Sequence, residues 1–447
     1  MSILKTFKRG GIHPEENKFS ENSEIKNIAI PKKVFIPISQ HMGAPAEIVV
    51  KKGDLVKVGT LLAKGEGFSA NVHSSVSGKV LKVEEIIDSS GYRKIVVTIK
   101  TDGDDWEASI DRSTDIIKDI TLSKEDIVFK VLKSGVVGLG GATFPTHIKL
   151  NIPNDKNVDT LIINGVECEP YLTADHRLML ERGVEVLIGT KILMKALDVD
   201  RAVIGIENNK ANAIENLKNI IKEDKEYCKG IEVQALKVKY PQGGEKQLIK
   251  ALLDREVPSG KLPLDAACVV QNVATAFASY EAIQKNKPLI ERIVTVTGKS
   301  VKTPSNFMTR FGIPISCLIG EAGGLPETAS KVISGGPMMG KALNSLEIPV
   351  VKGSSGILIL DKEESNRKKI RNCIRCAKCV DVCPMGLEPF FLENLSKRGE
   401  FDDMMVQNLM DCIECGSCSF ACVANRALLD YIRLGKIKIR EKSRKSS

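Results

Sequence analysis

The chain has 447 residues, enough for roughly two to four domains. Its apolar content of 43% and charged content of 27% are those of an ordinary globular protein, and no run of apolar residues is long enough to span a membrane. A net charge of +9, only 4% aromatic residues and no recognisable nucleic-acid motif argue against a nucleic-acid partner. The first residues lack the apolar stretch of a signal peptide, and clustered thiols indicate a reducing compartment, so we expect the cytoplasm or the cytoplasmic face of a membrane.

Short β-rich runs separated by glycine turns predict a small β module over about residues 34–100, within an N-terminal region of residues 1–119. The stretches 52–63 and 73–80 resemble the barrel-sandwich domain of biotinyl and lipoyl carriers. Carriers present a lysine at the tip of the hairpin between these stretches, but here Gly67 stands near that place and Lys64 comes too early. We therefore predict a packing or docking role for the barrel and no attached biotin or lipoate.

A glycine-rich turn follows a predicted helix at residues 124–134 and belongs to a second domain, expected over residues 120–288. Four glycines within residues 135–141 leave backbone N–H groups free to approach a phosphate, and Lys149 adds a cation nearby. The spacing is not that of a dinucleotide loop or a P-loop, so the pattern alone leaves an ordinary turn as the simpler interpretation.

Alternating strands and helices in this domain predict a Rossmann-like parallel α/β sheet. The expected strands are 159–164, 201–207 and 231–238, and the expected helices are 175–197, 210–224 and 246–254. Three polar segments, residues 164–170, 240–246 and 271–275, lie where strands end or helices begin. Because ligands bind at the carboxyl ends of parallel strands, these segments predict a binding site.

The rest of the chain predicts two smaller domains. Residues 289–360 form an α+β unit with strands at 292–298 and 331–334 and a short helix at 305–311. Residues 361–434 form a helical domain after a charged linker, with helices at 387–398, 401–410 and 426–434. The basic tail, residues 435–447, is expected to be solvated and frayed.

Eight of the twelve cysteines form two runs with the spacing C-x2-C-x2-C-x3-C. This spacing is typical of a two-cluster [4Fe–4S] ferredoxin module, in which the fourth cysteine of each run ligates the other cluster. The two expected ligand sets are Cys373, Cys376, Cys379 and Cys422, and Cys412, Cys415, Cys418 and Cys383. A zinc site or a disulfide framework fits this pattern poorly. The other cysteines, among them Cys168, are interpreted as packing residues.

Segments 140–145 (GGATFP), 164–170 (NGVECEP), 244–245 (GE) and 272–275 (NVAT) resemble the FMN- and NADH-binding subunit of respiratory complex I. The whole order, over roughly residues 10–430, resembles the C-subunit family of the Rnf complex, a membrane-bound ferredoxin:NAD⁺ oxidoreductase that couples electron flow to ion pumping. The resemblance implies FMN as cofactor, NAD(H) as substrate and a β-grasp module at residues 289–360. It also implies a peripheral place at the cytoplasmic face of the membrane, among other Rnf-type subunits that include a ferredoxin-like iron–sulfur subunit.

The resemblance further assigns residues by position. The implied FMN contacts are Gly138, Gly140, Lys149, Asn164, Asn272 and Thr275. The residues implied to border the flavin and nicotinamide are Glu167, Glu169 and Glu245, with Phe144 stacking on the nicotinamide. The chain departs from the family pattern at Val166, where an acid is expected, and at Gly244, where a second glutamate is expected.

Together these features predict a multidomain α/β protein that transfers electrons. Nicotinamide exchanges a hydride and a cluster takes single electrons, so a flavin between them matches the two chemistries. FMN would exchange a hydride with NAD(H), and two [4Fe–4S] clusters would relay single electrons to or from partner subunits. Two alternatives remain, namely a cobalamin reductase of similar layout and a non-enzymatic electron-relay scaffold.

Overall fold

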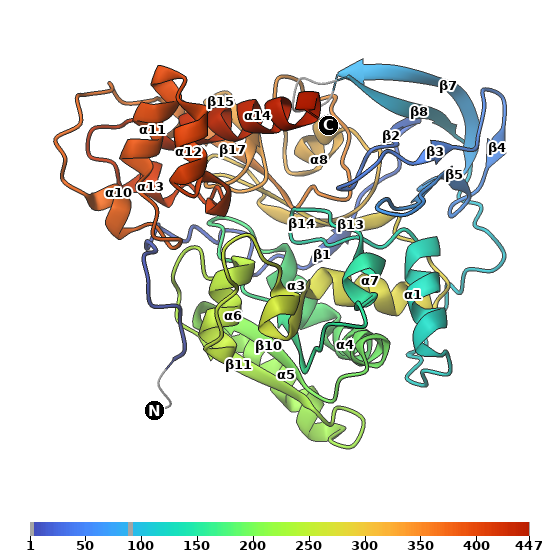
Figure 1. The fold of residues 1–447 in the computed structure, drawn as a ribbon. Coiled ribbons are helices and arrows are strands. Elements are labelled where there is room, and N and C mark those ends of the chain that lie inside the picture. Colours follow the sequence, from blue (N-terminus) through green and yellow to red (C-terminus); the bar gives the residue numbers. More distant parts are fainter. Residues whose placement is uncertain (1–3, 88–92, 447) are drawn as a thin grey trace.

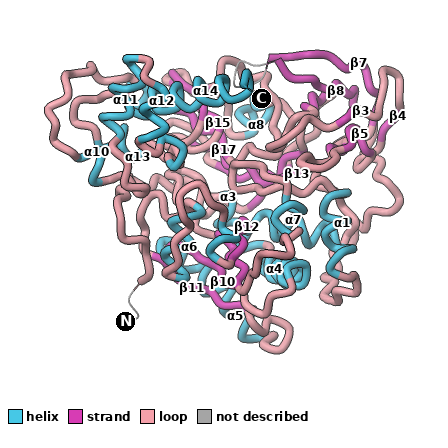
Figure 2. Tube along the Cα trace, in the orientation of Figure 1, coloured by secondary structure: helices cyan, strands magenta, loops and turns pink. Residues whose placement is uncertain are grey.

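The structure is a computed structural model that describes residues 4–87 and 93–446. In chain order it contains a barrel of short strands, a parallel α/β layer, a mixed sheet and a helical C-terminal part (Figure 1). Figure 2 shows that the C-terminal part is built from helices and loops, while the strands gather in the other three parts.

Two small antiparallel sheets make the barrel, in the orders β2-β8-β7-β4 and β3-β5-β6. Their strands are β2 Lys33–Pro37, β3 Glu47–Ile48, β4 Leu55–Val56, β5 Leu61–Lys64, β6 Val72–His73, β7 Gly78–Ile87 and β8 Arg93–Thr101. Val34 and Ile36 of β2 are fully buried and lie opposite Ile99 and Val97 of β8. These apolar cross-strand pairs fix the register, because a slip of one residue would turn them toward solvent.

The α/β layer is a parallel four-stranded sheet in the order β11-β10-β9-β12. Its strands are β9 Thr160–Asn164, β10 Ala202–Glu207, β11 Ile231–Leu236 and β12 Cys268–Asn272. β9 and β10 are buried almost along their whole length, as expected of strands covered on both faces. The strand order reverses at β9, and in such a sheet ligands bind outside the carboxyl ends of the strands at this switch point.

The helices of this layer are α1 Lys124–Lys133, α2 Thr146–Leu150, α3 Ala174–Glu181, α4 Gly183–Leu197, α5 Ala211–Glu223, α6 Glu245–Leu253 and α7 Val273–Gln284. Helices α4 to α7 lie against its strands. The single helix predicted at 175–197 is wrong, since α3 ends at Glu181 and a second helix, α4, begins at Gly183. Asn216 of α5 donates to the carbonyls of Met179 and Leu180, which are thereby satisfied at the end of α3. A Cβ at Gly183 would lie 2.8 Å from Cδ1 of Ile220, so a side chain there would displace side chains of α5.

The mixed sheet has six strands in the order β1-β14-β13-β17-β15-β16. They are β1 Ile25–Asn27, β13 Glu291–Thr297, β14 Ser305–Arg310, β15 Ala329–Ser334, β16 Lys341–Ala342 and β17 Gly356–Asp361, with α8 Ile315–Glu321 and α9 Lys362–Ser365 nearby. The short helix predicted at 305–311 is wrong, because this segment is β14. It pairs antiparallel with β13 and parallel with β1, so backbone pairing on both sides makes it a strand.

Residues 5–27 pair with parts of the chain outside the barrel, although the sequence grouped residues 1–119 as one region. Lys5 and Ile12 form isolated bridges with Leu236 and Tyr240 of the α/β layer. Farther along, β1 joins the mixed sheet at β14. This extended segment has no periodicity of its own, so the partners that it pairs with decide its place.

The C-terminal part contains α10 Lys378–Asp381, α11 Pro389–Arg398, α12 Phe401–Val406, α13 Ser417–Ala421 and α14 Leu428–Ser446, and it has its own apolar core. The predicted helix 401–410 is shorter than expected. The frayed tail predicted at 435–447 is wrong up to Ser446, because α14 continues through it with Lys436 and Ile439 buried. Within the described ranges, no helix is both long and apolar enough to cross a membrane.

Candidate functional site

The glycine loop, residues 135–147, is tied to the start of α7. The N–H of Leu139 donates to Thr275 Oγ1 at 2.9 Å, and the N–H of Gly138 donates to the carbonyl of Phe144 at 2.8 Å. A Cβ at Gly140 would lie 3.5 Å from Cβ of Asn272. The structure therefore brings Gly138, Gly140 and Thr275 together beside Asn272.

Two asparagines mark the switch point of the sheet. Asn164 ends β9 and lies opposite Asn272, which ends β12 and caps α7 by accepting from the N–H of Ala274 at 2.8 Å. Asn164 Nδ2 donates to the carbonyl of Gly243, at the turn before α6, at 2.9 Å. Polar side chains from two strands and a backbone carbonyl of the turn before α6 thus meet at one edge of the sheet, where the carboxyl ends of the strands lie.

A cation, an acid and an aromatic ring lie next to this edge. Lys149 Nζ is 2.7 Å from Glu245 Oε1 and 3.0 Å from the carbonyl of Val270. The same ammonium lies 5.8 Å from the centre of the Phe144 ring. The structure therefore pairs Lys149, which follows the glycine loop, with Glu245 from a distant segment, beside the Phe144 ring.

The other two predicted carboxylates are already hydrogen-bonded within the protein. Glu167 accepts from the N–H groups of Asp175 and His176 at the start of α3, at 2.8 and 3.1 Å. Glu169 accepts from the N–H groups of Met338 and Met339 in the mixed-sheet domain, and burial raises the pKa of its carboxyl to about 7. Their predicted place beside flavin and nicotinamide stays a prediction. In this structure both carboxylates accept hydrogen bonds from backbone N–H groups.

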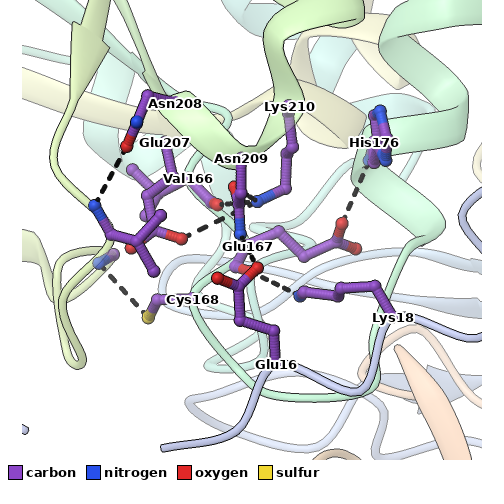
Figure 3. A network of polar contacts seen from close by, with 12 residues as sticks. Glu16, Lys18, Val166, Glu167, Cys168, His176, Glu207, Asn208, Asn209 and Lys210 are labelled. Carbon is purple, nitrogen blue, oxygen red and sulfur yellow. Dashed lines mark hydrogen bonds and ion pairs between the residues drawn. The ribbon is translucent and has the colours of Figure 1, made fainter. Parts of the chain in front are cut away.

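The half-buried Lys18 and the buried Lys210 hold the loop that carries these glutamates (Figure 3). Lys18 Nζ donates to the carbonyls of Glu167, Glu169 and Leu172 at 2.7–3.0 Å, and burial lowers the pKa of Lys18 to about 8. Lys210 Nζ donates to the carbonyl of Val166 and to Asn209 Oδ1, both at 2.9 Å. The sequence analysis missed both lysines, since neither belongs to a recognisable motif.

Two further charged residues under the site were also missed. Asp175 Oδ2 accepts from Asn272 Nδ2 at 2.7 Å, and burial followed by the nearby Glu167 raises the pKa of its carboxyl. Arg292, from β13, donates to the carbonyl of Leu139 inside the glycine loop at 3.1 Å. Burial lowers the pKa of Arg292 to about 10. Both residues lie in stretches that the sequence marked only as a helix or a strand.

Cys168 has no sign of a reactive thiol. Its sulfur accepts from the N–H of Gly243 at 3.3 Å, and burial raises the pKa of the thiol well above its usual range. A neutral thiol is a poor nucleophile, so the interpretation of Cys168 as a packing residue agrees with the geometry.

The eight cysteines of the C-terminal part line two separate cavities. The first, which we call the outer cavity, measures about 150 Å³ and is lined by Cys373, Cys376, Cys379 and Cys422. The second, which we call the inner cavity, is smaller and is lined by Cys383, Cys412, Cys415 and Cys418. These are the same two sets of four that the spacing predicted.

The two cavities differ in their surroundings. Cys373 and Cys376 of the outer cavity are exposed, whereas three cysteines of the inner cavity are buried. The hydroxyl of Tyr240, in the turn before α6, donates to the carbonyl of Cys415 at 2.8 Å. Gln247 of α6 also contacts Met385 beside the inner cavity. The inner cavity thus lies against the α/β layer near Glu245, and the outer cavity opens to solvent.

Four family models match successive parts of the chain. They are described as the RnfC barrel sandwich hybrid domain (residues 5–104), the Nuo51 FMN-binding domain (131–281), the SLBB domain (293–342) and a 4Fe-4S dicluster domain (372–425). Their order confirms the predicted order of domains.

Similar proteins cover nearly the whole chain. The C subunit of the proton-translocating ferredoxin:NAD(+) oxidoreductase complex of Clostridium ljungdahlii is 45% identical over 96% of this chain and 93% of its own length. The C subunit of the Na(+)-translocating ferredoxin:NAD(+) oxidoreductase complex of Acetobacterium woodii is 47% identical over 99% of both chains. Among solved structures, an NAD+-reducing [NiFe]-hydrogenase shares the fold over 69% of this chain and 62% of its own, with a TM-score of 0.51 and 17% identity.

Proposed function

Since the chain belongs to the C-subunit family of ion-translocating ferredoxin:NAD(+) oxidoreductase (Rnf) complexes, we propose that it carries electrons between NAD(H) and the other subunits of such a complex. The observation that carries this proposal is the contact between the α/β layer and the C-terminal part that holds the cysteines. Tyr240 hydrogen-bonds Cys415, so the turn that leads into Glu245 touches the inner cysteine set directly. Electron transfer needs such proximity between the nucleotide site and the first cluster.

The residues at the switch point fit FMN. The backbone at Gly140 and Gly141 is exposed, and the Cβ position at Gly141 has no atom within 4 Å, which leaves space for a ligand against the loop. The amides of Asn164 and Asn272 would bind polar groups of the cofactor, and Lys149 would offset the charge of its phosphate. Arg292 holds the loop from beneath through Leu139. When bound, FMN supplies the change from hydride chemistry to single electrons.

The nicotinamide would lie beside Phe144 and Glu245. Glu167 and Glu169 belong to a loop that would border the same site. Lys18 and Lys210 keep this loop rigid by binding its carbonyl groups. A rigid loop holds the reacting rings in one relative position, which is the main contribution that a protein makes to hydride transfer between bound rings.

The two cysteine sets would each ligate one [4Fe–4S] cluster. The inner set already receives N–H···S contacts, from Leu387 to Cys383 and from Glu414 to Cys412. Such contacts stabilise thiolate charge around a cluster and tune its potential. From its position, the inner set is the near relay for the nucleotide site, and the exposed outer set is the exit.

The surface around the exit suits an acidic protein partner. Within residues 366–378 all side chains are exposed, and the segment holds six cations: Arg367, Lys368, Lys369, Arg371, Arg375 and Lys378. Exposed apolar side chains lie among them and beside Cys422: Ile370, Ile374, Phe420 and Val423. A basic rim around an apolar centre would steer an acidic iron–sulfur subunit onto the outer cluster. In the complex, we expect this chain to lie peripherally at the cytoplasmic face of the membrane.

Anaerobic purification followed by cofactor analysis tests the proposal. We expect stoichiometric FMN and about eight irons with labile sulfide, the sum of two cubanes. Added NADH should then bleach first the flavin and then the cluster absorbance. Protein with zinc and no labile sulfide, or protein that binds no flavin, would contradict the proposal.

A further inference from the structure

One arginine at the outer cavity, Arg426, has no role in the function proposed so far. It follows Cys422, the last cysteine of the outer set, and it lines the cavity together with the four cysteines. Its side chain is only 13% exposed. In this respect Arg426 differs from the cations of residues 366–378, which are all exposed.

Two neighbouring residues of α11 hold the guanidinium of Arg426. Its Nε donates to Glu393 Oε2 at 2.6 Å, and its Nη2 donates to Asn394 Oδ1 at 3.2 Å. The third nitrogen, Nη1, makes no hydrogen bond to any residue that the structure describes. Because the planar group is bound at two of its three nitrogens, the positive charge has a fixed position at the cavity.

Glu393, which holds this arginine, is buried and has a second cationic partner. Only 1% of its side chain is exposed, and Lys397 Nζ lies 2.6 Å from its Oε1. A buried carboxylate with two cationic partners stays ionised. Arg426, Glu393 and Lys397 together therefore carry a net positive charge next to the outer cavity.

The inner cavity has different surroundings. None of the described residues that line it is charged. Lys436 lies close by, since its Nζ donates to the carbonyl of Cys412, but Lys436 also pairs with Glu414 of the cysteine loop at 3.2 Å. Within the described part of the chain, a fixed and largely shielded cation thus lines the outer cavity and not the inner one.

A charge in this position affects how readily a cluster takes up an electron. Reduction adds one negative charge to a site that already holds four thiolates, so a nearby cation favours the reduced state. The effect is strongest where water is excluded, because screening is weak there. The exposed cations of residues 366–378 are screened by water and salt, so they act more on the approach of a partner than on the cluster.

We propose that Arg426, held by Glu393 and Asn394, sets the reduction potential of the outer cluster by keeping a positive charge beside its cysteines. This inference rests on the proposed function, which places a [4Fe–4S] cluster on that cysteine set. An electron that arrives through the inner set is then held more firmly at the exit. Glu393 limits the effect, because its carboxylate offsets part of the charge.

The test measures midpoint potentials in the full chain, purified anaerobically with FMN and both clusters bound. Potentiometric titration followed by electron paramagnetic resonance reports on each cluster, and the signal that is missing in Cys376→Ser belongs to the outer one. Arg426→Gln removes the charge, Arg426→Lys keeps it, and Glu393→Gln removes its counter-charge. Arg398→Gln is the matched control, because Arg398 ends the same helix as Glu393, is exposed and lies outside the cavity lining.

We expect Arg426→Gln to keep iron, labile sulfide and FMN. It should lower the ratio of reduced to oxidised outer cluster at a given potential about tenfold, which is a negative shift of about 59 mV for one electron. Arg426→Lys should give a smaller shift, and Glu393→Gln should shift the potential in the positive direction. The inner cluster and the Arg398→Gln protein should keep their potentials. The shift in Arg426→Gln should persist at high salt, because a half-buried charge is screened little.

An unchanged outer potential in Arg426→Gln would overturn this inference and leave the proposed function intact. Shifts of the same sign in Arg426→Gln and Glu393→Gln would also overturn it, because altered packing would then explain both. If Arg426→Gln loses the outer cluster, Glu393→Gln decides, and an unchanged or more negative potential there would overturn the inference. Wild-type protein without any iron–sulfur signal would contradict the proposed function itself.

Discussion

Gly140 is the residue at which the smallest change should have the largest effect on flavin binding. A side chain there would point toward Asn272, since its Cβ would lie 3.5 Å from the Asn272 Cβ. Gly140→Val should therefore give folded protein with both clusters but without flavin. Gly320 in α8 is the control, because its Cβ position has no atom within 4 Å, and Gly320→Ala should keep FMN. Stoichiometric FMN and full NADH-driven cluster reduction in Gly140→Val would show that the flavin binds elsewhere.

Lys149 and Glu245 form one ion pair but should give different phenotypes. Lys149→Ala removes a cation from the phosphate of FMN and should weaken flavin binding by about 1.5–3 kcal/mol, the size of a charged hydrogen bond. Glu245→Gln keeps the size of the side chain and should retain FMN while slowing flavin reduction by NADH. Equilibrium dialysis of FMN and stopped-flow reduction separate the two effects. The same phenotype in both variants would mean that the pair acts only as a structural unit.

At the scale of elements, β14 holds the site domain and the mixed sheet together through one side chain. Asn306 Oδ1 accepts from the hydroxyls of Thr173 and Thr295, and its Nδ2 donates to the carbonyls of Ser20 and Ser23. The N-terminal segment, the residue before α3 and two strands thus meet at a fully buried amide.

Asn306→Ala should lower the free energy of unfolding by about 3 kcal/mol, because each buried polar group left without a partner costs ~1–3 kcal/mol. Chemical denaturation of the protein with its cofactors measures the change. The exposed Asn366 is the control, and Asn366→Ala should stay within about 0.5 kcal/mol of the wild type. A small effect of Asn306→Ala would mean that water replaces the amide.

At the scale of the whole molecule, Lys352 connects the barrel, the glycine loop and the mixed-sheet domain, and it makes their assembly depend on pH. Burial lowers the pKa of Lys352 from 10.5 to about 7. The unfolded chain therefore binds this proton more tightly than the folded one between these values, and stability should rise as the pH increases from about 7 toward 10. In Lys352→Met this contribution should vanish, while the exposed Lys100→Met keeps it. Denaturation at pH 7 and pH 9.5 checks the slope, and equal slopes in wild type and Lys352→Met would contradict the prediction.

The two cysteine cavities predict an order of electron transfer across the molecule. Cys376→Ser should leave about four irons and an intact flavin, because it affects only the outer set. NADH should still reduce the flavin and the remaining cluster, but electron delivery to a low-potential ferredoxin should be lost. Cys317→Ser, a cysteine outside both sets, serves as the control. Unchanged delivery to ferredoxin in Cys376→Ser would show that the outer cavity is not the exit.

Local patterns in the sequence determined a large part of this protein. Ligand spacing such as Cys373-x2-Cys376-x2-Cys379 depends on a few neighbouring residues, and it predicted which cysteines line each cavity. Buried strands such as β9 and capped helices such as α7 also followed from short stretches, because periodicity and capping act over one or two turns.

Only the tertiary structure decided the features that depend on distant partners. Segment 305–310 is a strand because β1 and β13 pair with it, and Glu167 and Glu169 bind backbone N–H groups that no local pattern reveals. Phe68 meets Phe144 because the barrel packs on the glycine loop through the buried Lys352. Backbone pairing, burial and desolvation act between segments far apart in the chain, and for this reason the arrangement of the site, unlike its set of residues, came from the fold.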